Sequence, residues 1–126
     1  MQRQEPNRVL AVVNDLFFSV KITDAAKRSG MSLEFVKDEQ EVLNKAASRP
    51  SLIIFDLNFD AVNPLNLIGA LKGNKETKSI SLLGYLSHIQ GELKQQAQEA
   101  GCDMVLARSA FSQNMSQIFK RHSGIG

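Results

Sequence analysis

The stretch SLIIFDLNF, residues 51–59, decides the fold. Leu52 to Phe55 are four consecutive apolar residues, and Asp56 follows them directly. A short, continuously apolar run predicts a strand that is covered on both faces, as in a parallel sheet. An aspartate at the end of such a strand is either a reactive carboxylate at the rim of the sheet or an ordinary turn residue.

Helical patterns separate this strand from four other short apolar runs. We expect strands at 9–13, 33–36, 52–55, 80–86 and 104–107. Between and after them, apolar residues recur at spacings of three and four, which predicts amphipathic helices. Their predicted buried faces are Phe18, Ile22, Ala25, Ala26 and Ser29; Val42, Leu43, Ala46 and Ala47; Leu65, Ile68 and Leu71; Leu93, Ala97 and Ala100; and Phe111, Met115, Ile118 and Phe119.

Three of the predicted helices begin at capping signals. Asn14 or Asp15 can cap the first helix, because either side chain can accept the free N–H groups of the first turn. Asp38 is expected to open the second helix. Asn63 is expected to cap the third, with Pro64 at the first helical position, where the missing N–H of proline costs no hydrogen bond.

The alternation of strands and helices predicts an α/β protein. Parallel strands need crossover connections, and right-handed crossovers place helices on both faces of the sheet. We therefore expect a (βα)5 doubly wound sheet of five parallel strands in a flavodoxin-like three-layer sandwich. It forms a single domain over residues 1–126, with a core at about 7–120, a polar N-terminus and a tail from Ser123 that frays.

Composition excludes several functional classes. The chain has 126 residues, 43% of them hydrophobic and 22% charged, with a net charge of +2. That charge is too small to indicate a nucleic-acid partner. No apolar run approaches the roughly 18 residues of a membrane span, and the polar start MQRQEPNR is not a secretion signal. The single Cys102 is expected to be a buried structural thiol, and we expect a cytoplasmic protein.

Open α/β sheets bind ligands outside the carboxyl ends of their strands. After the first strand the sequence reads VVNDLFF, without a glycine-rich phosphate loop, which disfavours nucleotide binding. If the first and third strands are neighbours, Asp15 and Asp56 lie close together, and Arg108 faces the same space. Two carboxylates and a backbone carbonyl are ligands that suit Mg²⁺.

These strand-end residues resemble those of the response-regulator receiver domain (CheY-like) of two-component signalling, over about residues 7–120. In that family an aspartate after the third strand accepts a phosphoryl group from a histidine kinase. An acidic pair after the first strand helps to hold Mg²⁺. A hydroxyl after the fourth strand and a lysine after the fifth contact the phosphoryl oxygens.

The resemblance assigns roles to positions of this chain. In FDLNFDAVNPL, Asp56 falls on the phosphoryl acceptor, and Asn58 falls on the residue whose backbone carbonyl reaches the metal. In VVNDLFFSVKI, Asn14 and Asp15 stand where the family has its acidic pair. In AGCDMVLARS, Arg108 stands where the lysine belongs. The implied metal ligands are therefore Asp15, Asp56 and the Asn58 carbonyl, with Asn14 as a degenerate member.

Departures from the family pattern decide the predicted function. Asn14 removes one acidic charge, so we expect weak Mg²⁺ binding. Leu86 aligns with the hydroxyl position, while Ser87 is one residue late and contacts a phosphoryl group only if the strand end slips by one residue. Arg108 keeps the positive charge but not the compact ammonium of lysine. Ser109 replaces the proline that usually follows.

Two further positions bear on this site. The family's switch aromatic lies on the fifth strand, where Val105 stands, so that readout is missing, while Tyr85 falls on the fourth strand. His88 lies in a polar loop beside the site, where most histidines are solvated.

We therefore expect a stand-alone receiver-like signalling module that is not an enzyme, with weak or absent phosphorylation, acting by protein–protein interaction. The expected partners are a histidine kinase or another signalling protein, or a second copy through the fourth helix, fifth strand and fifth helix. Asp56 is either an acceptor or a vestigial acid paired with Arg108. The alternative is a functional single-domain receiver phosphorylated at Asp56 in a phosphorelay. A small-molecule-binding flavodoxin-like domain is the second alternative.

Overall fold

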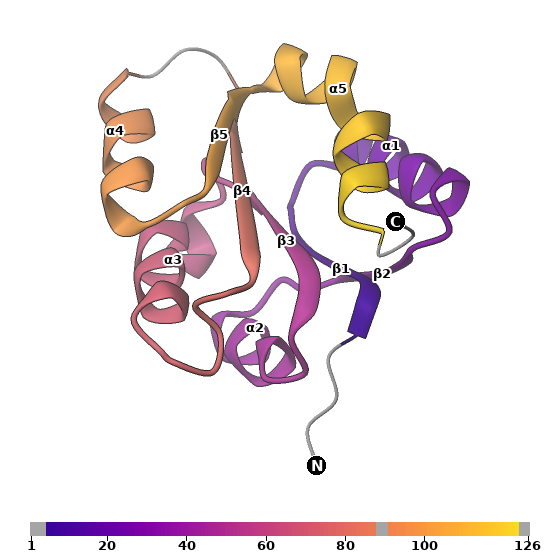
Figure 1. Ribbon diagram of the computed structural model, residues 1–126. Helices are drawn as coiled ribbons and strands as arrows, with labels where there is room; N and C mark the ends of the chain where they lie inside the picture. The colour runs from indigo at the N-terminus through magenta and orange to yellow at the C-terminus, as the bar shows by residue number, and fades with distance from the viewer. Residues whose placement is uncertain (1–4, 88–90, 124–126) are drawn as a thin grey trace.

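A computed structural model describes residues 5–87 and 91–123, and within these ranges five parallel strands form one sheet in the order β2-β1-β3-β4-β5 (Figure 1). The strands are β1 (Glu5–Val12), β2 (Ser32–Phe35), β3 (Pro50–Asp56), β4 (Ser81–Leu86) and β5 (Met104–Ala107). The helices are α1 (Leu16–Arg28), α2 (Glu39–Ala46), α3 (Pro64–Lys72), α4 (Gly91–Ala100) and α5 (Arg108–Arg121), with a short 3₁₀ helix, η1 (Asp60–Val62). The predicted (βα)5 order is confirmed.

Helices cover both faces of this sheet. Figure 1 shows α1 and α5 on one face and α2, α3 and α4 on the other. Alternate residues of β3 serve the two layers: Leu52 and Ile54 pack with α1 and α5, whereas Ile53 and Phe55 pack with α2, α3 and α4. The central strands are buried on both sides, which is why their sequences are continuously apolar. The predicted three-layer sandwich is confirmed.

Two capping predictions are confirmed in detail. The Asp15 carboxylate accepts the backbone N–H of Phe18 at 3.2 Å, and the Asp38 carboxylate accepts that of Glu41 at 3.0 Å. Asp15, rather than Asn14, is thus the cap of α1. Each bond satisfies one of the free N–H groups that every helix start presents.

The start of α3 matches the prediction in position but not in contacts. Pro64 is its first residue, and Asn63 precedes it in a left-handed conformation with φ 48°. The Asn63 side chain makes no capping bond, and its amide N–H donates to the Glu39 carboxylate at 3.3 Å. The predicted cap is therefore wrong, since the left-handed backbone of Asn63 is not the extended conformation typical of a capping residue.

Several boundary predictions are wrong. Strand β2 begins at Ser32, one residue earlier than predicted. Leu43 is 37% exposed and Ala47 is also exposed, because α2 buries only its Val42 and Ala46 stripe before ending. Ser29 lies partly exposed at the end of α1.

The predicted fraying of the tail is also wrong for its first residue. Ser123 is buried, and its hydroxyl donates to the Lys120 carbonyl at 2.8 Å. Residues 124–126 lie outside the described residues.

Cys102 is a buried structural thiol, as predicted. Its Sγ lies 3.5 Å from the Leu82 carbonyl oxygen and 3.4 Å from that of Met104. Burial is the main reason that the pKa of this thiol is raised to about 11. A thiol that stays protonated and covered is a poor nucleophile.

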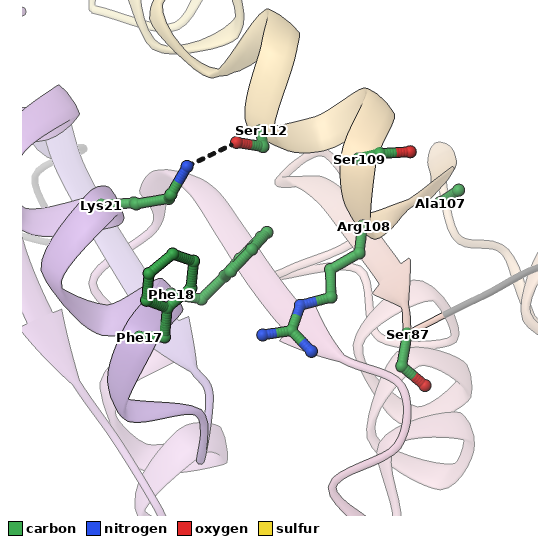
Figure 2. Close-up of a pocket in the computed structure, with 8 residues that line it drawn as sticks. All are labelled: Phe17, Phe18, Lys21, Ser87, Ala107, Arg108, Ser109 and Ser112. Carbon is green, nitrogen blue, oxygen red and sulfur yellow. Dashed lines mark hydrogen bonds between the residues drawn. The ribbon is translucent and has the colours of Figure 1, made fainter.

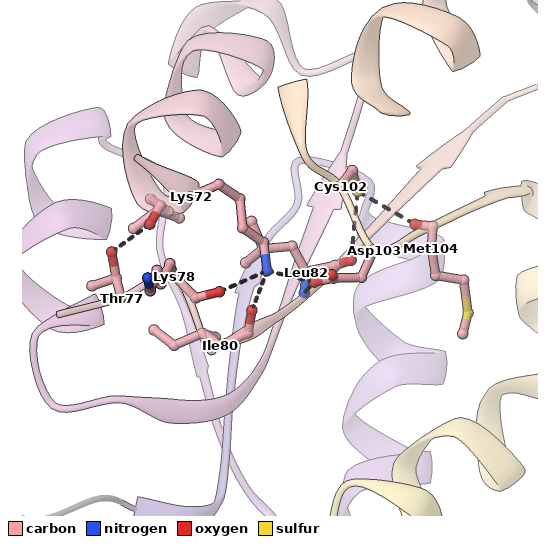
Figure 3. A network of polar contacts seen from close by, with 9 residues as sticks. Lys72, Thr77, Lys78, Ile80, Leu82, Cys102, Asp103 and Met104 are labelled. Atoms are coloured by element: carbon pink, nitrogen blue, oxygen red, sulfur yellow. Dashed lines mark hydrogen bonds and ion pairs between the residues drawn. The ribbon is translucent and has the colours of Figure 1, made fainter. Parts of the chain in front are cut away.

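A polar network around Lys72 holds together the ends of α3, β4 and β5 (Figure 3). The Lys72 ammonium donates to the carbonyls of Lys78 at 3.0 Å and Ile80 at 2.9 Å, and pairs with Asp103 at 2.8 Å. Asp103 in turn accepts the Leu82 N–H at 2.8 Å. The network lies at the amino-terminal edge of β4 and β5, away from the strand ends where Asp56 stands.

Gly101 is the glycine that this network requires. Its φ is +112°, and a Cβ there would lie 2.7 Å from Lys72 Cγ. We expect Gly101→Ala to lower the free energy of unfolding by about 2 kcal/mol or more, from backbone strain and displacement of Lys72. Gly69→Ala is the matched control: it is helical with nothing within 4 Å, and should stabilise by about 0.5–1 kcal/mol. Urea denaturation measures both, and equal values for the two variants would contradict the assignment.

Candidate functional site

The predicted site residues come together at the carboxyl edge of the sheet. Asp56 is the last residue of β3, and Asp15 follows the neighbouring strand β1. Arg108 is the first residue of α5, directly after β5, and Ser87 follows β4. Because all strands run in parallel, these four positions share one edge.

Both carboxylate oxygens of Asp15 have partners. While one carboxylate oxygen caps α1, the other forms an ion pair with the Arg108 guanidinium. The side chain of Asp15 is 19% exposed and that of Arg108 is 34% exposed, so the pair is partly shielded from water. Partial shielding strengthens the attraction relative to an ion pair in open solvent.

Arg108 is also held by an aromatic ring. Its Cζ lies 4.7 Å from the centroid of the Phe18 ring, which is in the range of a cation–π contact. The guanidinium is therefore fixed between the Asp15 carboxylate and Phe18, both at the start of α1. The ion pair of Arg108 goes to Asp15 and not to Asp56.

Backbone groups and two charged side chains surround the Asp56 carboxylate. One oxygen accepts the backbone N–H of Asn58 at 3.0 Å. Burial raises the pKa of Asp56, and the charge of Asp15 adds to that rise; the backbone N–H groups of Asn58 and Asn14 and the charge of Arg108 oppose it. The net direction is upward, because desolvation disfavours the charged form more than these partners favour it.

Asn58 links the end of β3 to the end of β4. Its side-chain oxygen accepts the backbone N–H of Ser87 at 3.0 Å and the Ser87 hydroxyl at 3.2 Å. Its backbone carbonyl, the expected metal ligand, accepts the N–H of Asp60 at 3.1 Å. This set of bonds places the Ser87 hydroxyl at the rim of the site.

Leu86 lies outside the site. Its side chain is 2% exposed and packs in the layer of α2, α3 and α4. The alternation along β4 therefore turns position 86 into the core, and the nearest exposed hydroxyl is that of Ser87. His88, considered as a loop residue beside the site, lies outside the described residues.

The donor set fits a divalent metal poorly. Both oxygens of Asp15 are engaged, and Asn14 is exposed and neutral. Across residues 5–87 and 91–123, no group of three or more histidine, cysteine, aspartate or glutamate side chains could hold a metal ion. Asp56 and the Asn58 carbonyl are the oxygens that remain, and a metal would have to compete with Arg108 for Asp15.

An open groove of about 750 Å³ runs beside Arg108, between α1 and α5 (Figure 2). Its floor and walls are Phe17, Phe18, Lys21, Ser87, Ala107, Arg108, Ser109 and Ser112. The Lys21 ammonium donates to the Ser112 hydroxyl at 2.9 Å and lies 5.3 Å from the Phe17 ring centroid. The groove thus combines aromatic rings with two positive charges.

Sequence reasoning missed two features here. Leu16, Phe17 and Val20 are 83%, 65% and 64% exposed, although all are large and apolar. Tyr85 is 1% exposed and packs in the layer of α1 and α5. A signal for the first was present: these three residues fall off the buried stripe that begins at Phe18.

The fold matches known receiver domains. No protein-family model and no curated protein matches the chain. Its structure is similar to that of a response regulator from Hahella chejuensis, with a TM-score of 0.83 and 20% identity over 94% of this chain and 96% of that one. It is also similar to the phosphorylated cyanobacterial phytochrome response regulator RcpA, with a TM-score of 0.77 and 20% identity over 93% and 91%.

A third similar structure is the Mn²⁺-bound form of response regulator Rcp1, with a TM-score of 0.75 and 17% identity over 92% of this chain and 91% of that one. At these identities the likeness shows the fold, and the chain has the fold of response-regulator receiver domains. Of the helices in the described part of the chain, none has the length and apolar character to cross a membrane.

The raised pKa of Asp56 gives a prediction for stability. A carboxyl whose folded pKa lies above its ordinary value of 3.8 destabilises the fold once it is charged. Stability then falls as pH rises from that value through the folded pKa. We expect Asp56→Asn to be more stable than the parent at pH 7, with the difference vanishing below about pH 4.

Thermal unfolding at both pH values measures this difference. Asp24→Asn is the matched control, since Asp24 is exposed and forms an ion pair with Arg28 of its own helix. It should change the free energy of unfolding by less than about 0.5 kcal/mol. A loss of stability in Asp56→Asn at pH 7 would show that the carboxylate stabilises the fold instead.

Proposed function

We propose that this protein is a receiver-like signalling module that acts by binding other proteins, with weak or absent phosphorylation at Asp56. The receiver fold supports the signalling class, and two proteins of similar structure are a phosphorylated response regulator and a Mn²⁺-bound one. Neither property is carried over directly, because the strand-end residues of this chain differ from the family pattern.

The Asp15–Arg108 ion pair is the observation that carries the proposal. Phosphoryl transfer depends on positioning and on cations that neutralise developing charge. Here the acid that would hold a metal and the cation that would meet the phosphoryl group neutralise each other. Accepting a phosphoryl group at Asp56 would require breaking this partly shielded pair.

The hydroxyl position adds to the same conclusion. Leu86 is buried in the core, and the Ser87 hydroxyl already donates to Asn58. A phosphoryl oxygen would gain no bond from Leu86, and would have to take the Ser87 hydroxyl from its present acceptor. We therefore infer that any phosphorylated form is a minor one and that it binds Mg²⁺ weakly. We also infer that the protein is not an enzyme.

Exposed apolar residues support a protein partner. Leu16, Phe17 and Val20 present large apolar side chains at one end of α1, next to the groove. Clustered exposure of this kind is typical of protein interaction sites. A histidine kinase or another signalling protein is the proposed partner, and α4, β5 and α5 offer a second face for a homodimer. We propose a cytoplasmic location, with neither nucleic acid nor membrane as a partner.

The alternative is a functional receiver that is phosphorylated at Asp56 by a histidine kinase. One observation favours it: Asp56 stands at the rim of the sheet, and the ion pair of Arg108 goes to Asp15 rather than to this carboxylate. The two proposals differ in how much phosphoryl group Asp56 accepts.

Acetyl phosphate with Mg²⁺ distinguishes them. We expect intact-protein mass spectrometry to find little or no phosphorylated protein, and none in Asp56→Asn. The double variant Asn14→Asp/Arg108→Lys, which restores the acidic pair and frees Asp15 from the guanidinium, should raise the phosphorylated fraction by about tenfold or more. Stoichiometric phosphorylation of the parent protein would overturn the degenerate-site proposal.

Partner binding tests the other half of the proposal. Because binding is expected not to need phosphorylation, the partner captured in cells by the parent protein should bind Asp56→Asn with the same affinity within about twofold. Phe17→Ser, which removes an exposed ring, should weaken that binding by about tenfold. Leu43→Ser, at an exposed position of α2, is the matched control. Loss of binding in Asp56→Asn would favour the functional receiver.

A further inference from the structure

Tyr85 carries a buried hydroxyl without a partner. It is the only tyrosine of the chain and is 1% exposed. Among the described residues, its hydroxyl is the buried side-chain polar atom that makes no hydrogen bond. A buried hydroxyl without a hydrogen-bond partner lowers the stability of the fold, and such groups are rare in native proteins, so its presence here needs an explanation.

The sheet register places Tyr85 beside Asp56. The two residues are paired on the adjacent strands β3 and β4, and cross-strand partners point to the same face of a sheet. That face is the layer of α1 and α5, where Ile54 and Leu83, two residues back along each strand, are also buried.

The aromatic neighbours of Tyr85 place its ring at the edge of the sheet that holds the site. The ring stacks with Phe18, with centroids 4.9 Å apart, and with Phe111, with centroids 5.3 Å apart. Phe18 is in the first turn of α1 and Phe111 in that of α5, and both helices begin at the carboxyl edge. Arg108 lies against the same Phe18 ring.

The charges around Tyr85 keep it a donor. Burial raises its pKa far above the usual value, and the charges of Asp56 and then Asp15 raise it further, against a smaller opposing effect of Arg108. The phenol is therefore protonated at any physiological pH. A protonated phenol can give one hydrogen bond, and in the present arrangement that bond is unmade.

We propose that the Tyr85 hydroxyl is a hydrogen-bond donor for a small tetrahedral anion that binds at Asp56 when Arg108 releases Asp15. The ligand class is a phosphoryl group or an analogue of one. The anion would draw the guanidinium away from Asp15, loosening the contact over Phe18, and would offer the acceptor that the hydroxyl lacks. Tyr85 then supplies the donor that Leu86 cannot. This inference rests on the proposed function in one respect only, that Asp56 can take such a group at least weakly.

Beryllium trifluoride is the probe that tests it. Its beryllium carries three fluorides and a water, and a carboxylate oxygen replaces the water, giving a tetrahedral group on Asp56. With Mg²⁺ present, fluorine NMR measures the dissociation constant. We expect Tyr85→Phe to weaken binding by about tenfold, the typical effect of losing a hydrogen bond to a charged group. Its thermal midpoint should be equal to or above that of the parent, because phenylalanine keeps the stack.

Two controls complete the experiment. Thr23→Ala removes an exposed hydroxyl that donates to the Ser19 carbonyl of its own helix, and it should change the affinity by less than twofold. In the parent protein, which has no tryptophan, the ultraviolet difference spectrum on adding the probe reports Tyr85 alone. It should show a red shift that Asp56→Asn abolishes.

Equal affinity in Tyr85→Phe, or no spectral shift on binding, would overturn the assignment while leaving the proposed function standing. Failure of the parent to bind the probe would also overturn it, and would agree with absent phosphorylation. Stoichiometric reaction with acetyl phosphate would overturn the proposed function but not the role of Tyr85.

Discussion

The pairing of β3 with β1 on one side and β4 on the other fixes the position of Asp56. Phe55 lies opposite Val12 and Gly84, and Asp56 lies opposite Tyr85. Because strand residues alternate between faces, a shift of one residue would send Asp56 to the layer of α2, α3 and α4. Gly84 leaves room for the Leu57 side chain, since a Cβ there would lie 2.9 Å from it. The location of the carboxylate is thus a consequence of backbone pairing between buried strands.

Asp15 joins the stability of the fold to the chemistry of the site. One carboxylate caps α1, pairs with Arg108 and raises the pKa of Asp56. These roles compete, because an oxygen committed to a guanidinium is not available to a metal, and a guanidinium committed to Asp15 does not meet a phosphoryl group. In this arrangement the charges of Asp15 and Arg108 neutralise each other.

The sequence predicts the fold because its signals are local. Apolar runs, the cap at Asp38 and Pro64 at the start of α3 each follow from a few neighbouring residues. Exposure of Leu43 could not be predicted, since it depends on how far α2 reaches over the sheet. The Asp15–Arg108 pair could be placed only in outline, because two strand ends far apart in the sequence had to be brought together. Whether the side chain at position 86 or 87 faces the site depends on the residue at which β4 ends, because side chains alternate between the two faces of the sheet up to that point. No local sequence pattern specifies that residue.

Tyr85 shows why the polar atoms of a core carry information that its apolar atoms do not. A phenylalanine at this position would stack with Phe18 and Phe111 equally well and would leave no buried donor unsatisfied. In the arrangement with Arg108 on Asp15, the hydroxyl therefore destabilises the fold. A second arrangement, in which an acceptor reaches the hydroxyl, would offset this cost. The anion that would best draw Arg108 from Asp15 is also the acceptor that the hydroxyl needs, so both features point to the same occupied state of the site.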